Sequence, residues 1–342
     1  MPMAASSRPQ HLIRLGDLTR GQLDDLLDLS ARLKRRAKKG GAGELVGRTA
    51  GLLFFRGSLR TRTSFEAAVN QLGGQVIHLT AASDFWELEE REGAVMDGRA
   101  PEHIKDAAAV LSCYVDALAI RPKPSGSSWA VDRQDGEIRA WAAHARVPVI
   151  NMESALWHPL QALADLLTLR EALGELGGRR LAVVWTRSPA PASPAPVHSL
   201  LHAALRFGMN VAVAHPPGYE LDNEVMSEAR ALSAESGAEL ADAVDLTAAI
   251  EDADVVYGRS WQSLEDYGNP TLAATRRARS PDWTIDERLL SRGRQARFMH
   301  AMPVRRNLEV TDAVLDGPHS LVYQQAENRL HSQKALLSML LR

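Results

Sequence analysis

The sequence predicts an α/β protein with two domains, each built on a parallel sheet with helices on both faces. Strand-like and helix-like segments alternate along the chain, as the crossover connections between parallel strands require. The alternation runs twice, once on either side of a long apolar segment at 160–173. The 342 residues are enough for two domains of ordinary size. We therefore expect a first domain at 1–150 and a second at 151–323.

Apolar runs mark the predicted strands of the first half. The run TAGLLFF at 49–55, for example, indicates a strand buried on both faces. Amphipathic runs indicate helices, one of which has Pro101 at the first helical position, where proline is favoured. In chain order we expect helix 19–39, strand 49–55, helix 62–72, strand 75–79, helix 101–112, strand 117–120 and strand 147–150.

The second half repeats this rhythm. Its clearest strand is LAVVW at 181–185, and its last helix closes the chain. In chain order we expect helix 160–173, strand 181–185, helix 197–207, strand 210–214, helix 222–236, strand 253–257, strands 297–299 and 320–322, and helix 324–341.

Two long loops interrupt the pattern, at 80–100 and at 187–197. Loops of this length are often functional. The second carries four prolines, which is typical of an extended linker. Its place between a buried strand and a helix of one domain favours an ordered loop instead.

Composition excludes several classes of protein. Charged residues make up 24% and the net charge is −2, so no basic surface for nucleic acid is expected. Cys113 is the only cysteine, which excludes intramolecular disulfides and favours a cytoplasmic protein. We expect no signal peptide at the start of the chain, and no stretch is apolar enough to span a membrane. Zinc-ligand spacings and nucleotide-binding glycine motifs are also missing, so we expect no metal and no cofactor.

A candidate anion site follows the strand at 49–55. Ser58, Leu59, Arg60, Thr61 and Arg62 stand where that strand leads into a helix. A helix N-terminus offers unpaired N–H groups and partial positive charge, the hydroxyls add donors, and guanidinium groups fit oxyanions. The alternative is a capped helix with solvated arginines, and the motif alone does not separate the two.

Further polar clusters favour the anion site. Each lies at the end of a predicted strand or at the start of a helix, where open α/β sheets bind ligands. They are Arg121, His158–Gln161, His300–Pro303 with Arg305 and Arg306 behind it, and Glu327–Arg329.

The order of these motifs resembles the aspartate/ornithine carbamoyltransferases over nearly the whole chain. FFRGSLRTRTSFE at 54–66, NMES at 151–154 and QAENRLH at 325–331 are similar to the N-acylornithine branch. The resemblance implies carbamoyl transfer from carbamoyl phosphate to the side-chain amine of an acylated ornithine in arginine biosynthesis. It also implies a homotrimer with shared active sites, domains joined by interdomain helices, a first domain completed by helix 324–342, and a trefoil knot at the loop 187–197.

The resemblance also implies residue roles. The phosphate is bound by Ser58, Leu59 through its N–H, Arg60, Thr61, Arg62 and, from a neighbouring subunit, Trp86. The developing oxyanion is stabilised by Thr61, Arg121 and His158, which are the catalytic residues. The carbamoyl NH₂ is held by Gln161 and the carbonyls of Ala301 and Met302, and Arg329 completes this site. The acylornithine is bound by Glu153, Ser188, Arg259, Met302 and Arg305.

One position concerns the acyl group. Acetyl-specific relatives carry Glu where this chain has Pro101, and succinyl-specific relatives carry Pro. A Glu there repels a succinyl carboxylate, whereas Pro leaves room. Ser188 and Arg259 replace a His and a Lys of the branch, and Glu309 stands where some acetyl-type relatives carry a Lys that becomes carboxylated. We expect N-succinyl-L-ornithine as the acceptor.

Other acceptors and other functions stay open as alternatives. The same transfer could use N-acetyl-L-ornithine or L-ornithine. The Asp-x-x-x-Ser-Met-Gly segment usual in ornithine enzymes is missing, and the matching region reads RSWQSLEDYG at 259–268. A non-catalytic relative that binds carbamoyl phosphate is a competing interpretation, against which the complete anion set argues.

Overall fold

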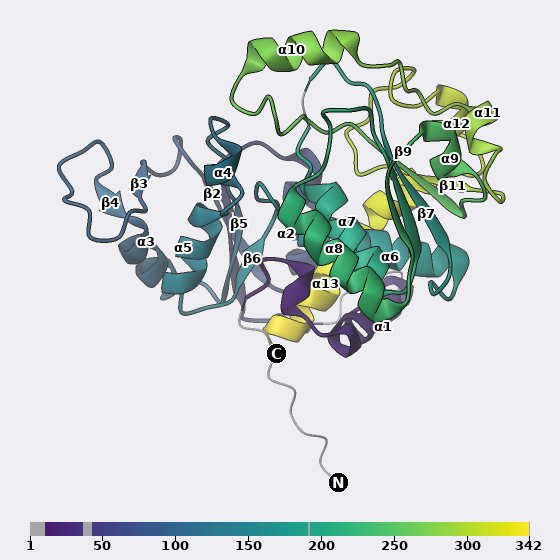
Figure 1. Cartoon of the computed structure of the whole chain (residues 1–342). Coiled ribbons are helices and arrows are strands. Elements are labelled where there is room, and N and C mark those ends of the chain that lie inside the picture. The colour runs from purple at the N-terminus through teal and green to yellow at the C-terminus, as the bar shows by residue number, and fades with distance from the viewer. Residues whose placement is uncertain (1–10, 37–42, 191, 342) are drawn as a thin grey trace. The chain divides into compact units, whose positions relative to one another are not determined.

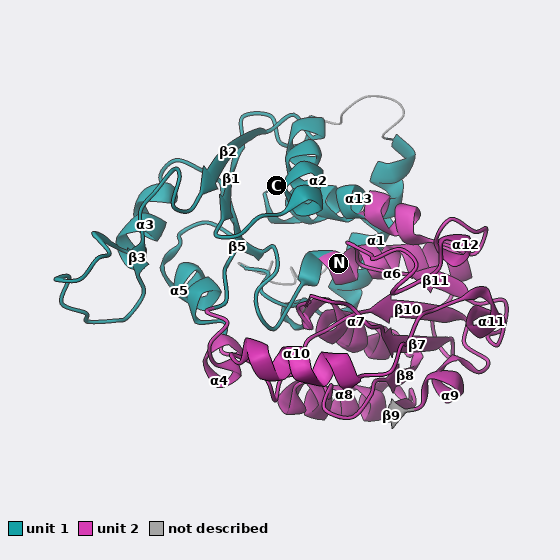
Figure 2. Ribbon diagram, turned by 90° about the horizontal axis from the view of Figure 1, so that it is seen from above, with its two compact units in different colours: residues 1–124, 135–160, 329–342 teal, residues 125–134, 161–328 magenta. Residues whose placement is uncertain are grey.

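The computed structural model describes residues 11–36, 43–190 and 192–341, and these form two compact units. Unit 1 contains residues 1–124, 135–160 and 329–342, and unit 2 contains 125–134 and 161–328. Figure 2 colours the two units separately. The main passage from unit 1 to unit 2 lies between residues 160 and 161, residues 125–134 also belong to unit 2, and helix 324–341 is divided between the units at residue 329.

The sheet of unit 1 has four parallel strands in the order β2-β1-β5-β6, of which β2, β5 and β6 are labelled in Figure 1. β1 is buried along almost its whole length, as its apolar sequence predicts. A core that includes Leu53, Ile120 and Trp141 lies between this sheet and its helices. The strands are β1 Thr49–Phe54, β2 Gln75–Thr80, β5 Ala117–Arg121 and β6 Val149–Asn151. The main helices are α1 Arg20–Arg36, α2 Leu59–Gln71, α3 Ile104–Leu111 and α5 Gly136–His144.

The sheet of unit 2 has five parallel strands in the order β11-β10-β7-β8-β9. Its core includes Val184, Val256 and Phe298. The strands are β7 Arg180–Trp185, β8 Asn210–Ala214, β9 Leu240–Val244, β10 Val255–Arg259 and β11 Arg297–Met299. The helices are α4 Trp129–Asp132, α7 Ala195–Arg206, α8 Asn223–Ser236, α9 Leu246–Ile250, α10 Pro270–Arg279, α11 Glu287–Leu290 and α12 Asp312–Leu315. Two long helices, α6 Pro159–Leu173 and α13 Val322–Leu340, contribute residues to both units.

Several predicted elements need correction. Pro101 does not open a helix, because residues 102–103 form a short strand, β4 Glu102–His103, that pairs with β3 Leu88–Glu89. The side chain of His103 caps α3 instead, accepting from the backbone N–H of Lys105. The predicted strand 320–322 is a single bridge at Ser320, after which α13 begins. The last residues of the predicted helix 19–39 lie outside the described part of the chain.

In both sheets the strand order reverses beside a central strand. In unit 1 the reversal lies between β1 and β5, where Phe54 stands opposite Arg121. In unit 2 it lies between β7 and β10, where Trp185 stands opposite Arg259. The carboxyl ends of strands at such a reversal leave a crevice in which α/β proteins bind ligands. Among the predicted site residues, Ser58–Arg62 follow β1, Ser188 follows β7, and Arg121 and Arg259 are the last residues of β5 and β10.

Candidate active site

The beginning of α2 is built to receive an anion. Ser58 is its N-cap, with extended backbone, and the Ser58 Oγ accepts from the N–H of Thr61 at 3.3 Å. The other N–H groups of the first turn have no partner within the helix. Leu59 is exposed, so its predicted contact with phosphate must come from its backbone N–H. The α2 N-terminus therefore combines backbone amide donors, a hydroxyl and partial positive charge.

Two arginines are fixed beside this helix start. Arg62 stacks over the ring of Phe54, with its guanidinium carbon 4.2 Å from the ring centroid, and donates to Thr80 Oγ1 at 3.0 Å. Arg329, which α13 brings into unit 1, donates to Thr61 Oγ1 at 2.8 Å. Both guanidinium groups are held in place before any ligand arrives, which lowers the entropy cost of binding one.

Arg121 ends β5 at the reversal of the unit 1 sheet. Its guanidinium donates to the carbonyl of Met152 at 3.2 Å and forms a close ion pair with Glu153. Burial lowers the pKa of Arg121; Glu153 raises it, while the charges of Arg56 and Arg60 lower it further. The surroundings of Arg121 thus carry more positive charge than Glu153 balances. A bound anion would relieve this imbalance.

Glu153 and His158 lie on one tight turn between β6 and α6. Glu153 is buried and has a positive φ of 133°, and the side chain of Asn151 accepts its N–H at 2.9 Å. Its carboxylate lies 3.9 Å from Nε2 of His158. Burial lowers the pKa of His158 well below its usual value. The charge of Glu153 raises this pKa, whereas the charges of Arg329, Arg121 and Arg56 lower it. At neutral pH His158 is therefore an uncharged imidazole, suited to donate a hydrogen bond without giving up a proton.

In unit 2 the amide of Gln161 is oriented by a buried carboxylate. Asp165 Oδ1 accepts from Nε2 of Gln161 at 2.8 Å and from Nε2 of Gln325 at 2.7 Å. The oxygen of Gln325 in turn accepts the N–H of His300 at 2.9 Å. Because the Gln161 nitrogen is committed to Asp165, its amide oxygen is the group suited to accept from a carbamoyl NH₂.

The loop after β11 is held by a buried histidine–glutamate pair. His300 Nε2 lies 3.0 Å from Glu309, and the N–H of Met302 donates to His300 Nδ1 at 2.9 Å. This pattern makes His300 the Nε2–H tautomer and fixes Met302, whose φ is +39°. Burial acts to raise the pKa of Glu309, but the hydrogen bonds from His300 and from the Arg305 N–H, helped by the charge of Arg259, outweigh it and lower that pKa.

Three predicted acylornithine-binding residues also lie in unit 2. Arg259 ends β10 and is buried, and its Nε has no hydrogen-bond partner among the described residues. Arg305 donates through Nε to Ser188 Oγ at 3.1 Å. A buried guanidinium with an unsatisfied N–H suits a ligand carboxylate.

Trp86 and Pro101 lie together on the loop that carries β3 and β4. Trp86 is 57% exposed and its indole N–H donates to Glu102, the neighbour of Pro101, at 2.7 Å. Pro101 is exposed as well. Figures 1 and 2 show this loop at an edge of unit 1, beside α3. No hydrogen bond or ion pair joins either residue to the arginines at α2 within the described chain.

Sequence reasoning missed three residues of these sites. Arg56 donates to the carbonyl of Glu153 at 3.0 Å, and Asp165 and Gln325 orient Gln161. Arg56 could have been found, since it lies just beyond β1 in the segment that carries the motif. Asp165 lies one helical turn after Gln161, which was also a usable signal.

No group of three or more His, Cys, Asp or Glu side chains within 11–36, 43–190 and 192–341 could hold a metal ion. No helix in the same ranges is long and apolar enough to cross a membrane.

Family models match both halves of the chain. Residues 10–171 match the carbamoyl-P binding domain of aspartate/ornithine carbamoyltransferase. Residues 195–340 match the Asp/Orn binding domain of the same family.

Individual relatives agree with these matches. N-acetylornithine carbamoyltransferase of Xanthomonas campestris pv. campestris is 40% identical, over 97% of this chain and 97% of that protein. Ornithine carbamoyltransferase of a Parafrankia species is 41% identical, over 97% and 96%. A solved N-acetyl-L-ornithine transcarbamylase, with a Glu replaced by Pro and in complex with carbamyl phosphate and N-succinyl-L-norvaline, has a TM-score of 0.92. It is 40% identical and covers 96% of this chain and 99% of its own.

Proposed function

The chain belongs to the aspartate/ornithine carbamoyltransferase family, and from this premise we propose that it carbamoylates the side-chain amine of an acylated ornithine, with N-succinyl-L-ornithine preferred. The products are N-succinyl-L-citrulline and phosphate. The observation that carries the proposal is the group of arginines where the unit 1 sheet reverses its order: Arg121 and Arg56 both pair with Glu153, and Arg329 donates to Thr61 at the start of α2. The proposed donor, carbamoyl phosphate, supplies the anion that this cluster lacks.

Phosphate binding is assigned to the α2 N-terminus. Ser58, Arg60 and Arg62 offer hydroxyl and guanidinium donors to its oxygens, beside the backbone N–H groups. In the reaction the amine nitrogen bonds to the carbonyl carbon, and the bond from that carbon to the phosphate oxygen breaks. The amine loses a proton that the departing phosphate accepts. No covalent enzyme intermediate is needed, so proximity and electrostatics carry the catalysis.

The carbonyl oxygen gains negative charge as the amine attacks. Thr61, Arg121 and His158 are the donors assigned to it. Arg121 supplies charge and His158 a neutral hydrogen bond, because burial lowers the pKa of that imidazole well below its usual value. Thr61 accepts from Arg329 at 2.8 Å, which turns its own hydroxyl hydrogen toward another acceptor. Gln161, with its amide oriented by Asp165, takes the carbamoyl NH₂ together with the carbonyls of Ala301 and Met302.

The acylornithine is assigned mainly to unit 2. Arg259 has an unsatisfied buried Nε, and Arg305 is already aimed by Ser188, so each guanidinium suits a carboxylate. Glu153 accepts the amide N–H of the acyl group. Its carboxylate is paired with Arg121 in the free protein, so the substrate amide and Arg121 share it in the complex.

The preference for succinyl rests on Pro101. The solved relative with Pro in place of a Glu holds N-succinyl-L-norvaline beside carbamyl phosphate. By the resemblance, Pro101 occupies the position of that Glu. Pro101 is exposed, and its uncharged ring adds no negative charge near an incoming carboxylate.

N-acetyl-L-ornithine is the second candidate acceptor. The Xanthomonas relative, at 40% identity over 97% of the chain, is an N-acetylornithine carbamoyltransferase. Glu309 also supplies a buried negative charge beside His300, where acetyl-type relatives gain one by carboxylation of a lysine.

Comparing acceptors tests both candidates. Wild-type protein is assayed for citrulline-type product from N-succinyl-L-ornithine, N-acetyl-L-ornithine and L-ornithine, and the first should have the highest kcat/KM. Pro101→Glu should reverse the preference between the first two by about one to two powers of ten, since like charges about 5 Å apart repel by roughly 1–3 kcal/mol. Pro101→Ala is the matched control and should keep the wild-type order. A wild type that prefers the acetyl substrate, with a ratio unmoved by Pro101→Glu, contradicts the succinyl assignment.

We also propose a homotrimer in which Trp86 serves a neighbouring subunit. The support is its 57% exposure on a loop that has no bond to the arginines of its own chain in the described residues. Mixing Arg62→Ala chains with Trp86→Ala chains should restore activity in roughly a quarter of the shared sites. Mixtures no more active than the separate variants contradict site sharing.

A further inference from the structure

A short strap carries the chain from unit 1 into unit 2 and back. Residues 125–134 belong to unit 2, whereas Pro124 and Asp135 on either side belong to unit 1. Asp132, in the strap helix α4, accepts the backbone N–H groups of Ser125 and Gly126 at 2.9 and 2.7 Å. It also accepts the hydroxyl of Tyr267 at 2.6 Å. Tyr267 lies on the loop that begins after Arg259, so the strap is tied to the loop of the predicted acyl site.

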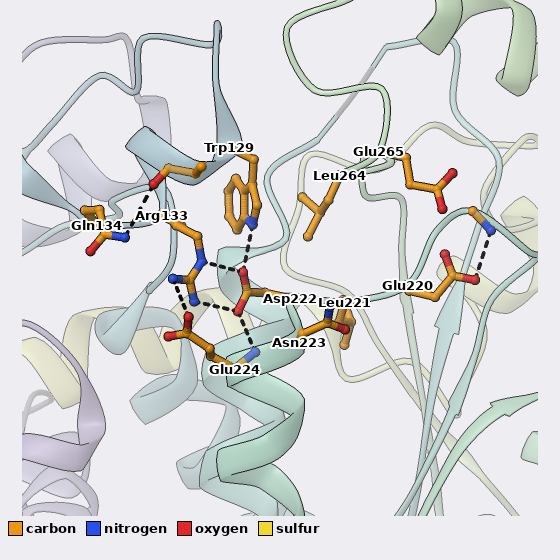
Figure 3. A pocket seen from close by; sticks show the side chains of 12 residues that line it. Trp129, Arg133, Gln134, Glu220, Leu221, Asp222, Asn223, Glu224, Leu264 and Glu265 are labelled. Carbon is orange, nitrogen blue, oxygen red and sulfur yellow. Dashed lines mark hydrogen bonds and ion pairs between the residues drawn. The ribbon is translucent and has the colours of Figure 1, made fainter.

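A second anchor ties the strap to α8 (Figure 3). Arg133 donates two parallel hydrogen bonds to the carboxylate of Asp222, from Nε at 2.8 Å and from Nη2 at 3.0 Å. The indole of Trp129 donates to the same carboxylate at 2.7 Å. Asp222 is also the N-cap of α8, accepting from the N–H groups of Glu224 and Val225. The strap is therefore fixed to the body of unit 2, not merely laid on it.

Asp135 comes directly after the strap. Its side chain binds the turn between β6 and α6, residues 152–158, which is called the catalytic turn below. Its Oδ2 accepts the hydroxyl of Ser154 at 2.7 Å, and its Oδ1 accepts the N–H groups of Ala155 and Leu156 at 3.1 and 3.3 Å. Those three residues lie between Glu153 and His158, the residues assigned to the acyl amide and the oxyanion. The buried carboxylate thus holds the turn that carries both.

The local role expected of Asp135 is a different one. It stands at the N-cap of α5, where aspartate ordinarily accepts an N–H of its own helix. Here its side chain makes no such bond, and its backbone is left-handed, with φ +52°. Asp135 thus has a strained backbone and leaves α5 without a side-chain cap, while its carboxylate binds the catalytic turn. Because Asp135 does not cap its own helix, we take its function to be binding the turn that carries Glu153 and His158.

We infer that Asp135 is a positioning residue for carbamoyl transfer and that the strap couples it to the acyl-site loop. Asp132 and Asp135 are three residues apart, so at most about 11 Å of chain joins their α-carbons. A displacement of Tyr267 is passed through Asp132 to Asp135, and from there to Glu153 and His158. The inference rests on the proposed function for its kinetic meaning, but the physical coupling does not depend on turnover.

Hydrogen–deuterium exchange tests the coupling without substrate. In full-length protein, Asp135→Asn should speed exchange of the backbone amides of 153–158 by roughly tenfold or more, since it weakens the bonds that hold them. Tyr267→Phe removes one hydroxyl and leaves no void, yet it should also speed exchange in 153–158, which belong to the other unit. Val131→Ala, at an exposed position of α4, is the matched control and should change nothing there. Unchanged exchange at 153–158 in Tyr267→Phe overturns the coupling.

Steady-state kinetics, with the acceptor that the wild type carbamoylates best, test whether Asp135 positions the catalytic turn. Asp135→Asn should lower kcat by roughly 10- to 100-fold, as small misplacements of reacting groups do, and change the KM for carbamoyl phosphate by less than about twofold. Tyr267→Phe should lower kcat by roughly threefold to tenfold, and the double variant by less than the product of the two effects. A folded Asp135→Asn protein with wild-type kcat overturns the positioning role. A wild type that carbamoylates no acylornithine overturns the proposed function instead, and leaves the exchange result to decide the coupling.

Discussion

The two sheets share one strand plan but differ in the connections that leave their central strands. The order β2-β1-β5-β6 in unit 1 corresponds to β8-β7-β10-β11 in unit 2. After β1 the chain reaches α2 through residues 55–58, whereas after β7 it runs through 186–194 before α7 begins. The short connector brings a helix N-terminus to the reversal point. The long one brings a proline-rich loop with Ser188. The connection that follows the central strand, and not the sheet itself, therefore determines which ligand can bind where the strand order reverses.

The electrostatics of the two reversal points differ as well. Around Arg121 in unit 1, Arg121 and Arg56 both pair with the carboxylate of Glu153, and the charge of Arg60 helps to lower the pKa of Arg121. In unit 2 the buried Glu309 is paired with His300, and the charge of Arg259 helps to lower the pKa of Glu309. The first arrangement suits a compact, doubly charged group. The second suits a longer molecule with both polar and charged parts.

The largest expected effect tests the unit 1 cluster. Arg121→Ala should lower kcat by roughly two to three powers of ten, because it removes a preorganised donor to the developing oxyanion. Steady-state kinetics at saturating substrates measure this, and a melting curve shows whether the folded population persists, since Glu153 loses its partner. A kcat equal to that of the wild type removes Arg121 from the mechanism.

A pair of variants should separate the two reversal points by substrate. Arg60→Ala should weaken carbamoyl phosphate binding by about 10- to 100-fold, the worth of one charged hydrogen bond, and leave the acylornithine KM nearly unchanged. Arg259→Gln should do the reverse. Arg259→Lys, which keeps the charge, is the control and should retain most of the activity. If both variants impair both substrates equally, the division of labour between the units is wrong.

The smallest expected effect is a pH dependence at Asp135. Burial raises the pKa of Asp135 to about 6, against the lowering effects of Ser154, the N–H groups of Leu156 and Ala155, and the charge of Arg139. Below that pH the carboxyl takes up a proton and loses acceptor capacity toward the turn, so kcat should fall as pH drops through about 6. Burial lowers the pKa of His158 well below its usual value, so its titration is shifted away from that of Asp135. In Asp135→Asn the ratio of kcat at pH 7 to kcat at pH 5.5 should be smaller than in the wild type, by roughly threefold. An equal ratio in both proteins excludes Asp135 as the titrating group.

Much of the fold could be predicted because apolar periodicity is local. TAGLLFF and LAVVW gave β1 and β7 nearly to the residue. β9 was missed because Asp242 interrupts its apolar pattern, and an edge strand needs little apolar sequence. The strand at 102–103 forms through pairing with Leu88 and Glu89, which no local pattern encodes.

The residues of the candidate site also divide into those that local sequence predicts and those that only the tertiary fold brings together. The Ser58–Arg62 motif and Arg121 were readable because they stand directly at strand ends. Asp135 was not, since its partners Ser154, Ala155 and Leu156 come together with it only through the tertiary fold. The place of Arg329 beside Thr61 is also tertiary, and only the family resemblance suggested it.

The division of unit 1 into three chain segments has a consequence for the newly made protein. Residues 329–342 complete that unit, and Arg329 reaches Thr61 only after all of unit 2 has been synthesised. Domains ordinarily fold in the order in which the ribosome releases them. Here unit 1 waits for the second part of α13 before Arg329 can join Thr61 at the proposed anion site. A nascent chain in which this part of α13 has not yet been made therefore lacks one arginine of that site.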